Sequence, residues 1–305
     1  MRTFILLFVC TLAFTDLMAQ PPKVSDYTLD KINLPAEMNK QVCISGMKYF
    51  NGQLYFASER CPKIIVFDPA KATISNTINI QVQNNFEMEG MTSYKGKLYL
   101  VSENIAAVYE VTVPTGAIKT IQTSIALPEK SKDGDGMEGI AANEKNNKFY
   151  LLRERNETMS ASQLYTFTVE AGNVISPLVL KYESMVELPL KNSQWRYSDI
   201  CVDTANSRLL CLKSYSKGKS RQQYLESVDI DKNGKLLVET LKNIPVENFT
   251  DASSTYKTQQ YSLNLEGITI DNTGTIYIIS DNTTGKASCE LDAKEKTILL
   301  KLKKK

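Results

Sequence analysis

Acidic residues recur at two fixed positions along this chain, and the repetition is its strongest chemical signal. The first position holds an acid in four of five short segments, at Glu89, Glu138, Asp199 and Glu266, and a serine in the other, at Ser45. The second position follows 14 to 16 residues later and again holds four acids, Glu59, Glu103, Glu154 and Asp281, and one serine, Ser214. Carboxylates brought together repel one another unless a cation balances them or some stay protonated. If the repeats converge in space, we therefore expect a site for a hard cation.

The elements that carry these residues have the pattern of paired β-strands. Each first position opens a short strand pattern, and each second position ends the next one, as in the segment 98–103. Further alternating strands follow, such as 108–113, 163–169 and 224–230, which gives about four strands per repeat. Repeats of 44 to 67 residues with four strands and almost no helical periodicity are typical of propeller blades. The sequence predicts an all-β fold, a β-propeller.

Five repeats are visible, so we expect five blades, with a sixth, degenerate blade as the alternative. The last repeat has only the strand 297–302 after its hairpin, whereas 27–34 is a lone strand before the first repeat. The N-terminal strand is therefore expected to complete the final blade and close the ring, which removes a free sheet edge. This single domain would span residues 20–305.

In a propeller the innermost strand lines the central channel and the second strand runs back antiparallel to it. Both acidic positions should then lie at one mouth of the channel. Calcium takes six to eight oxygen ligands and suits such a site. The expected metal ligands are Glu89, Glu103, Glu138, Asp199, Glu266 and Asp281. Alternatively, the Glu-Gly pair is only a blade signature, in which Glu accepts hydrogen bonds from backbone amides of the next blade and Gly permits close approach.

Basic and aromatic residues are expected near the same mouth, where they would bind a small-molecule or phosphorylated ligand. Arginine is a preferred partner of phosphate and carboxylate groups, and aromatic rings can stack on a ligand. The candidates for substrate binding are Arg60, Arg153, Trp195, Tyr197 and Lys213. The basic residues would equally serve to pair with the acidic ring, and the aromatic residues to pack at the surface.

Composition excludes several function classes. The chain has no histidine, which excludes Ser-His-Asp and Cys-His catalysis, histidine-rich zinc hydrolase sites and any histidine general base. Lys and Arg total 36 against 34 Asp and Glu, so no nucleic-acid partner and no anionic membrane partner is expected. The protein is expected to be a monomer.

The first 19 residues have the pattern of a secretory signal. Arg2 precedes an apolar run over 4–14, and small residues follow up to Ala19. The run is too short to span a membrane. The expected location is secreted or periplasmic, where disulfides can form. Two hairpin pairings, Cys43 with Cys61 and Cys201 with Cys211, would leave Cys289 unpaired; the alternative is that the cysteines form no bridges.

Several motifs together resemble a known family. They are Phe86-Glu-Met-Glu-Gly-Met-Thr92, Asp135-Gly-Met-Glu-Gly-Ile140, Tyr197-Ser-Asp-Ile200, Leu265-Glu-Gly-Ile-Thr-Ile-Asp271 and Ile279-Ser-Asp-Asn282. Over roughly residues 40–285 the chain resembles the secreted propellers called "esterase-like activity of phytase" and the related SdiA-regulated (YjiK-like) proteins. The resemblance implies a calcium-binding propeller with phosphoester- or ester-hydrolase activity. The acids that match the family pattern are Glu89, Glu138, Asp199, Glu266 and Asp281.

Two functions fit these residues. In a calcium-dependent hydrolase, Glu138 or Glu89 would act as general base, and Arg155 or Arg60 would stabilise developing charge. In a non-catalytic binding module, calcium would be structural and the same mouth would capture a ligand or a protein. The absence of histidine and of a recognisable nucleophile favours the second function.

Overall fold

The computed structural model describes residues 26–40, 42–82, 86–132, 135–173, 176, 178–217, 220–246, 264–282, 289, 291–293 and 296–305. The predicted signal segment 1–19 lies outside these residues. The described chain is built from strands and one short 3-10 helix, η1 (Ala36–Asn39). None of its helical segments has the length and apolar character needed to cross a membrane.

The strands fall into antiparallel groups of four that follow one another along the sequence. Blade 1 contains β2 (Ile44–Phe50), β3 (Gln53–Ser58), β4 (Lys63–Asp68) and β5 (Thr73–Asn79). Blade 2 contains β6 (Met88–Tyr94), β7 (Lys97–Ser102), β8 (Ala107–Thr112) and β9 (Ala117–Thr123). Blade 3 contains β10 (Met137–Asn143), β11 (Lys148–Arg153), β12 (Ala161–Ala171) and β13 (Leu178–Pro189). Blade 4 contains β14 (Trp195–Asp203), β15 (Arg208–Lys217), β16 (Ser220–Ile230) and β17 (Leu236–Asn243).

The last group joins the two ends of the chain. Its strands are β18 (Asn264–Ile270), β19 (Ile276–Asp281), β20 (Leu299–Lys304) and β1 (Tyr27–Ile32). β1 pairs antiparallel with β20 from Tyr27 opposite Lys304 to Ile32 opposite Leu299. The N-terminal strand therefore completes the group that the C-terminal strands begin, as the sequence predicts, and we refer to it as blade 5.

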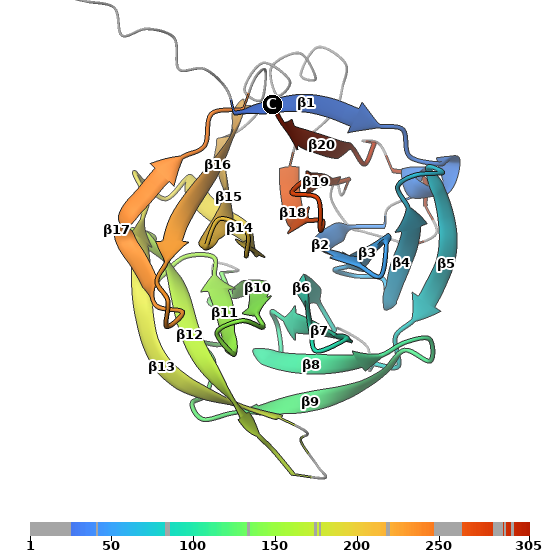
Figure 1. The fold of residues 1–305 in the computed structure, drawn as a ribbon. Coiled ribbons are helices and arrows are strands. Elements are labelled where there is room, and N and C mark those ends of the chain that lie inside the picture. The colour runs from blue at the N-terminus through green and yellow to red at the C-terminus, as the bar shows by residue number, and fades with distance from the viewer. Residues whose placement is uncertain are drawn as a thin grey trace, which may run out of the picture.

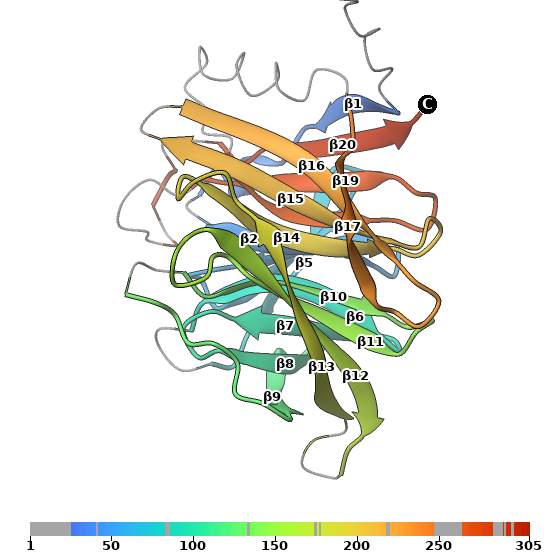
Figure 2. The same cartoon turned by 90° about the vertical axis from the view of Figure 1, so that its left-hand side faces the viewer.

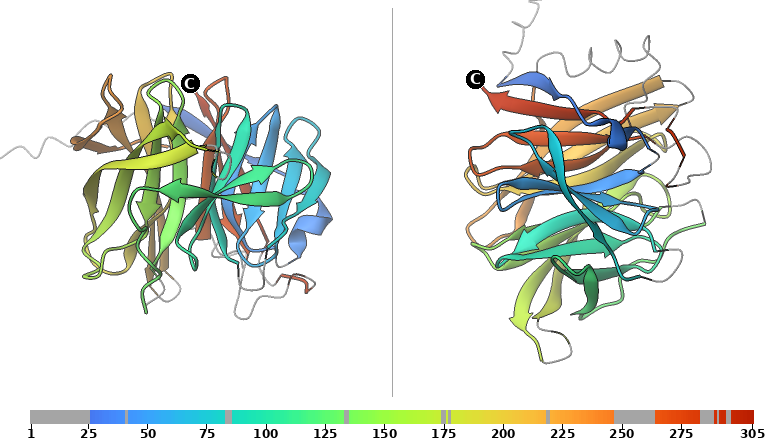
Figure 3. Two further views of the ribbon diagram at one scale, coloured as in Figure 1. Left: turned by 90° about the horizontal axis from the view of Figure 1, so that it is seen from below. Right: turned by 90° about the vertical axis from the view of Figure 1, so that its right-hand side faces the viewer.

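The groups stand around a common axis, with β2, β6, β10, β14 and β18 innermost and β1, β5, β9, β13 and β17 on the outside (Figure 1). The side views show the twisted strands of successive blades lying beside one another across the molecule (Figures 2 and 3). Blades 2 and 3 are also joined at their outer edges, where β9 and β13 pair in parallel over two residue pairs. The predicted all-β propeller is confirmed, and the five described groups match the five sequence repeats.

Apolar side chains hold neighbouring blades together. Each of five buried clusters contains residues from two adjacent blades. Between blades 2 and 3, for example, the ring centroids of Tyr99 and Phe149 lie 5.4 Å apart, with Leu151 and Val101 fully buried beside them. Apolar burial contributes about 25 cal/mol per Å². The core is thus a ring of interfaces, and it fixes how closely the innermost strands approach the axis.

Glycine is required where these innermost strands meet. A Cβ atom on Gly90 would lie 2.6 Å from the backbone nitrogen of Ile140 in the next blade. A Cβ atom on Gly46 would lie 1.9 Å from the carbonyl oxygen of Glu89. Real side chains do not tolerate such contacts with backbone, so the Gly of the Glu-Gly pair serves close packing between blades. That part of the blade-signature alternative is confirmed.

The disulfide differs from both sequence alternatives. Cys61 is bonded to Cys289, 228 residues away, with 5.7 Å between their Cα atoms. Cys201 lies opposite Leu210, whereas Cys211 lies opposite Ile200, so the two cysteines face opposite sides of their sheet. Cys43, Cys201 and Cys211 are buried thiols. The predicted hairpin pairings are therefore wrong, and the bridge instead links blade 1 to the segment between β19 and β20.

The bridge gives a first prediction. Changing Cys61 to Ala should lower the free energy of unfolding by about 2–4 kcal/mol, because a bond that closes so long a segment restricts the unfolded chain. Cys289→Ala and the double variant should show the same loss, because each change removes the same bond. Chemical denaturation of the three variants measures it. Peptide mapping under non-reducing conditions should recover Cys61 joined to Cys289, and a Cys43–Cys61 peptide would contradict the structure.

Candidate functional site

A β-bulge at the start of the innermost strand determines where the side chain at the first acidic position points. In blade 3, Met137 lies opposite Arg153 and Gly139 lies opposite Leu152, so Glu138 has no partner across the strand pair. The same step in pairing occurs at Ser45 in blade 1 and at Glu266 in blade 5. β6 has a related irregularity that includes Glu89. Bulges redirect side chains, and here they direct them into the end of the channel.

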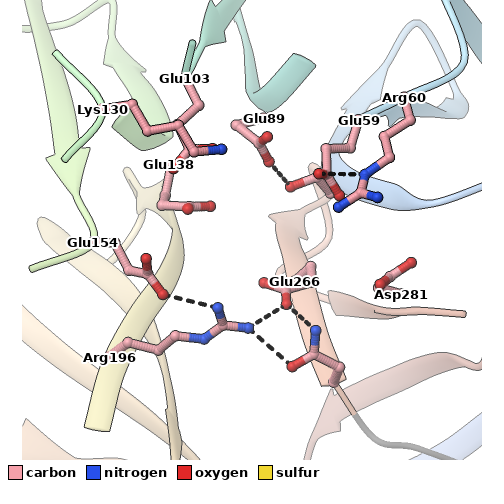
Figure 4. A pocket seen from close by; sticks show the side chains of 12 residues that line it. Glu59, Arg60, Glu89, Glu103, Lys130, Glu138, Glu154, Arg196, Glu266 and Asp281 are labelled. Carbon is pink, nitrogen blue, oxygen red and sulfur yellow. Dashed lines mark hydrogen bonds and ion pairs between the residues drawn. The ribbon is translucent and has the colours of Figure 1, made fainter. Parts of the chain in front are cut away.

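These residues, together with the second acidic positions of blades 1, 2, 3 and 5, line a cavity of about 360 Å³ (Figure 4). Its seven carboxyl groups belong to Glu59, Glu89, Glu103, Glu138, Glu154, Glu266 and Asp281. The other lining residues are Ser45, Arg60, Lys130, Arg196 and Asn264. The structure thus brings together five of the six residues predicted to bind metal, from blades that are far apart in sequence.

Asp199, the sixth, does not line the cavity. In blade 4 the bulge falls at Ser198, between Tyr197 and Asp199, so Asp199 stands where the other blades have glycine. Its side chain turns toward blade 5, where Oδ2 accepts the backbone N–H of Ile268 at 2.8 Å. The expected placement in the acidic ring is corrected, because a shift of one residue along a strand reverses the direction of its side chain.

Blade 4 contributes a cation to the cavity instead of an acid. Both of its acidic positions hold serine, Ser198 and Ser214, and Arg196 extends into the space between blades 3 and 5 (Figure 4). The guanidinium donates to Glu154 at 2.8 Å and to Glu266 at 2.5 Å. Arg196 is not among the candidates for substrate binding named above; the two serines are the signal that could have singled it out.

Three carboxylates are close enough to share one cation. One oxygen from each of Glu103, Glu138 and Glu154 lies within 4.8 Å of the others. Glu103 and Glu154 are buried, and Glu103 Oε1 has no hydrogen-bond partner although it is out of contact with solvent. An unpartnered buried carboxylate oxygen is costly, and a cation would satisfy it. This donor set contains only oxygen, which suits a hard divalent ion.

Crowding and burial also shift the protonation of the cavity. Burial, followed by the nearby charges of other glutamates, raises the pKa of Glu89 and of Glu138 well above the usual value. Burial raises the pKa of Glu103 to about 7 and that of Glu266 to about 7. Burial alone would raise the pKa of Glu154 too, but Arg196 and other donors lower it. The cavity therefore holds protons near neutral pH when no metal ion is bound.

Two further basic groups lie at the cavity, each paired with an acid. Arg60 Nε donates to Glu59 at 2.9 Å, and this arginine side chain is 44% exposed. Lys130 pairs with Glu87 at 2.9 Å and also with Glu103. Sequence reasoning missed Lys130, because it lies in the segment between β9 and β10, outside every repeat motif. The alternative in which basic residues pair with the acidic ring is confirmed for Arg60.

Arg155 and Arg153 do not line the cavity. Arg155 lies behind it, where Nε donates to Asp135 at 2.6 Å and Nη1 donates to the carbonyl oxygen of Ser193 at 2.6 Å. Arg153 precedes the second acidic position of blade 3 and points the other way, so that Nη1 donates to Glu157 at 2.6 Å. The expected position of Arg153 at the mouth is corrected, and the alternation of side chains along a strand explains its direction. Arg155 stays next to the mouth, because its Nη2 lies 4.0 Å from Glu154 Oε2.

Trp195, Tyr197 and Lys213 belong to a separate cluster on blade 4. The Lys213 ammonium lies 5.7 Å from the Trp195 ring and 5.0 Å from the Tyr197 ring. It also pairs with Glu226 at 3.2 Å, and the hydroxyl of Tyr197 donates to the same carboxylate. Tyr197 is completely buried. These three residues therefore pack the blade, and none of them is part of the cavity wall.

Solved structures with low sequence identity resemble this chain along most of its length. The crystal structure of the glutaminyl cyclase of Myxococcus xanthus has a TM-score of 0.50 and 12% identity, covering 92% of this chain and 98% of that one. A streptogramin B lyase structure has a TM-score of 0.44 at 12% identity, covering 91% of this chain and 98% of that one. A luciferin-regenerating enzyme has a TM-score of 0.46 at 10% identity, with 90% and 95% covered.

At these identities the likeness to the glutaminyl cyclase shows the fold alone. No curated protein sequence matches the chain. One family model does match, over residues 46–283, which include every carboxyl group of the cavity. The chain therefore belongs to the phytase-like family described as "esterase-like activity of phytase".

Proposed function

We propose that this protein is a calcium-binding β-propeller that hydrolyses a phosphoester or ester at the acidic mouth. One observation carries the proposal: the carboxylates of Glu103, Glu138 and Glu154 approach one another within 4.8 Å, and Glu103 Oε1 has no partner. Membership of a family named for esterase-like activity of phytase supports the reaction class. Glu89, Glu266 and Asp281, the other expected ligands at the cavity, would hold water or a second part of the ligand.

The residues around the three carboxylates have the chemistry that hydrolysis needs. A bound calcium ion would polarise a phosphoryl or carbonyl oxygen and lower the pKa of a water molecule. Glu89 lies outside the group of three. Its raised pKa would make its carboxylate a stronger base than an ordinary glutamate once the charge of the bound ion has displaced its proton. Arg60 is the most exposed of the three cavity cations, so it is placed to meet the negative charge of a phosphate.

A non-catalytic binding module is the second candidate, and one observation favours it. Arg60, Lys130 and Arg196 are each already paired with a carboxylate of the cavity or its rim. An anionic substrate would have to displace one of these pairs. In this alternative, calcium is structural and the mouth captures a small ligand or a protein.

We further propose that the protein is exported to a secreted or periplasmic location and acts as a monomer. The apolar run near the N-terminus supports export, and the Cys61–Cys289 bond is of a kind that persists in oxidising compartments. In the described part of the chain, the exposed large apolar residues stand apart in sequence, at Ile105, Val113, Met185 and Leu291.

Calcium binding should be visible as stabilisation. At a calcium concentration 100 times the Kd, the free energy of unfolding should rise by about 2.7 kcal/mol, because the ion binds only the folded chain. Glu138→Gln should abolish most of this gain, and EGTA should remove it from the wild-type protein. Glu170→Gln changes an exposed carboxylate of β12 outside the cavity, so this variant should keep the full calcium-induced gain. Thermal unfolding with and without calcium measures the effect; equal gains in wild type and Glu138→Gln would reject this site.

Hydrolysis should depend on the same ion. With calcium, the protein should turn over p-nitrophenyl phosphate, bis(p-nitrophenyl) phosphate or p-nitrophenyl acetate, and EGTA should stop it. Glu89→Gln should reduce the rate about 100-fold or more, since a general base contributes 10²–10⁴-fold, while the calcium-induced stabilisation persists. Glu170→Gln serves again as the matched control. If calcium-loaded wild type turns over none of the three esters, the binding module is the correct function.

The metal-free protein should lose stability as the pH rises. Glu103 and Glu266 have a pKa of about 7 when folded, against the ordinary 4.5, so the folded state holds more protons between these values. The stability that they contribute is complete below pH 4.5 and is lost as the pH passes 7. In EGTA, the Tm should therefore be lower at pH 8 than at pH 5. The chain has no histidine to complicate this interval.

A matched variant makes the pH prediction specific. Glu103→Gln/Glu266→Gln removes two of the titrating groups and leaves Glu89 and Glu138, whose pKa values are also raised, so its Tm in EGTA should fall less than that of the wild type between pH 5 and pH 8. Calcium added at pH 8 should raise the Tm of the wild type more than calcium added at pH 5, because protons compete with the ion. An equal fall in Tm for the wild type and the double variant would place the pH dependence elsewhere.

A further inference from the structure

Arg196 has a position that no other basic residue in the cavity shares. It comes from the blade whose acidic positions are both serine, and it bridges the acids of the two flanking blades. Nη1 donates to Glu154 in blade 3 at 2.8 Å, and Nη2 donates to Glu266 in blade 5 at 2.5 Å. Arg196 therefore places a fixed positive charge between blades 3 and 5, in a cavity whose carboxylates come from blades 1, 2, 3 and 5 (Figure 4).

The remaining contacts of Arg196 fix the guanidinium in place. Nε donates to Ser214 Oγ at 3.2 Å, and Nη2 also donates to Asn264 Oδ1 at 3.0 Å. The side chain is only 24% exposed. A guanidinium has five N–H donors, and each of its three nitrogens is engaged by this chain. Arg196 is thus poorly placed to reach out for a substrate, in contrast to the more exposed Arg60.

Glu154 connects this arginine to the three-carboxylate group. Its Oε1 accepts from Arg196, while one oxygen of the same side chain lies within 4.8 Å of oxygens of Glu103 and Glu138. Asn264 also donates to Glu266, so the acid on the far side of the arginine is held by two donors. Arg196 thus engages Glu154 and Glu266, two carboxylates that a second divalent ion beside the first would use. Glu59 and Glu89 of the cavity, in contrast, form no hydrogen bond or ion pair with it.

We propose that Arg196 is a built-in counter-cation that takes the place of a second divalent ion, so that the mouth binds one calcium ion. This inference rests on the proposed calcium site. A second ion would need six to eight oxygen ligands, and the guanidinium both occupies two of the nearest carboxylates and repels a like charge. Arg196 is in this sense a specificity-determining residue, which sets the number of ions and holds Glu154 toward the first.

Calcium counting tests the inference directly. Isothermal titration with CaCl2, checked by metal analysis after gel filtration, should give one ion per wild-type chain. Arg196→Met keeps most of the apolar stem and removes the charge, and it should bind two ions because Glu154 and Glu266 are released. Arg196→Lys retains one positive charge and should bind one ion. Arg60→Met removes a different cavity cation, paired with Glu59, and should also bind one ion.

Each outcome bears on the proposal in a defined way. One ion in wild type and two in Arg196→Met support it, and one ion in both, or two in wild type, overturns it while calcium binding stands. No binding by the wild type overturns the proposed calcium site itself and this inference with it. Two ions in Arg60→Met would mean that removing any positive charge from the cavity creates a second calcium site, which overturns the special role of Arg196. If Arg196→Met folds only with calcium, the variant is refolded in calcium and its bound ions are counted by metal analysis.

Discussion

The repulsion among seven carboxyl groups in one small cavity is the constraint on which the rest of this structure depends. Out of bulk water, charges at these separations interact much more strongly than at an open surface. The chain offsets the repulsion in two visible ways. Arg60, Lys130 and Arg196 each pair with acids, and the raised pKa values of Glu89, Glu103, Glu138 and Glu266 mean that protons are retained. A divalent ion at Glu103, Glu138 and Glu154 would be the third way.

Such a cavity requires a frame that cannot relax away from it. The frame is the closed ring, in which every blade is packed against two neighbours through a buried apolar cluster and β1 joins β20. Gly46 and Gly90 let the innermost strands approach within contacts that no side chain would permit. The acidic positions are therefore held near one another by packing elsewhere, which is why electrostatic repulsion does not separate the blades.

Much of this arrangement follows from the sequence, because propeller repeats place equivalent residues at equivalent heights. The strand pairing, the closure by the N-terminal strand and the convergence of Glu89, Glu138 and Glu266 could all be predicted from spacing alone. Asp199 could not, because a bulge shifts a strand by one residue without any trace in hydrophobic alternation. The Cys61–Cys289 bond and the role of Lys130 depend on segments between repeats, where no periodicity constrains the partner.

The departures from symmetry carry more functional information than the repeat itself. A ring with an acid at every position would be equally attractive to cations all round and would give a ligand no orientation. Here the serines of blade 4 remove two acids, and Arg196 converts that side into a fixed positive charge opposite the buried oxygen of Glu103. An ion held by Glu103, Glu138 and Glu154 would then lie to one side of the axis, facing Glu89 and the exposed Arg60. Under the proposed function, that offset would allow a symmetric fold to present one cation, one base and one anion-binding group to a single substrate.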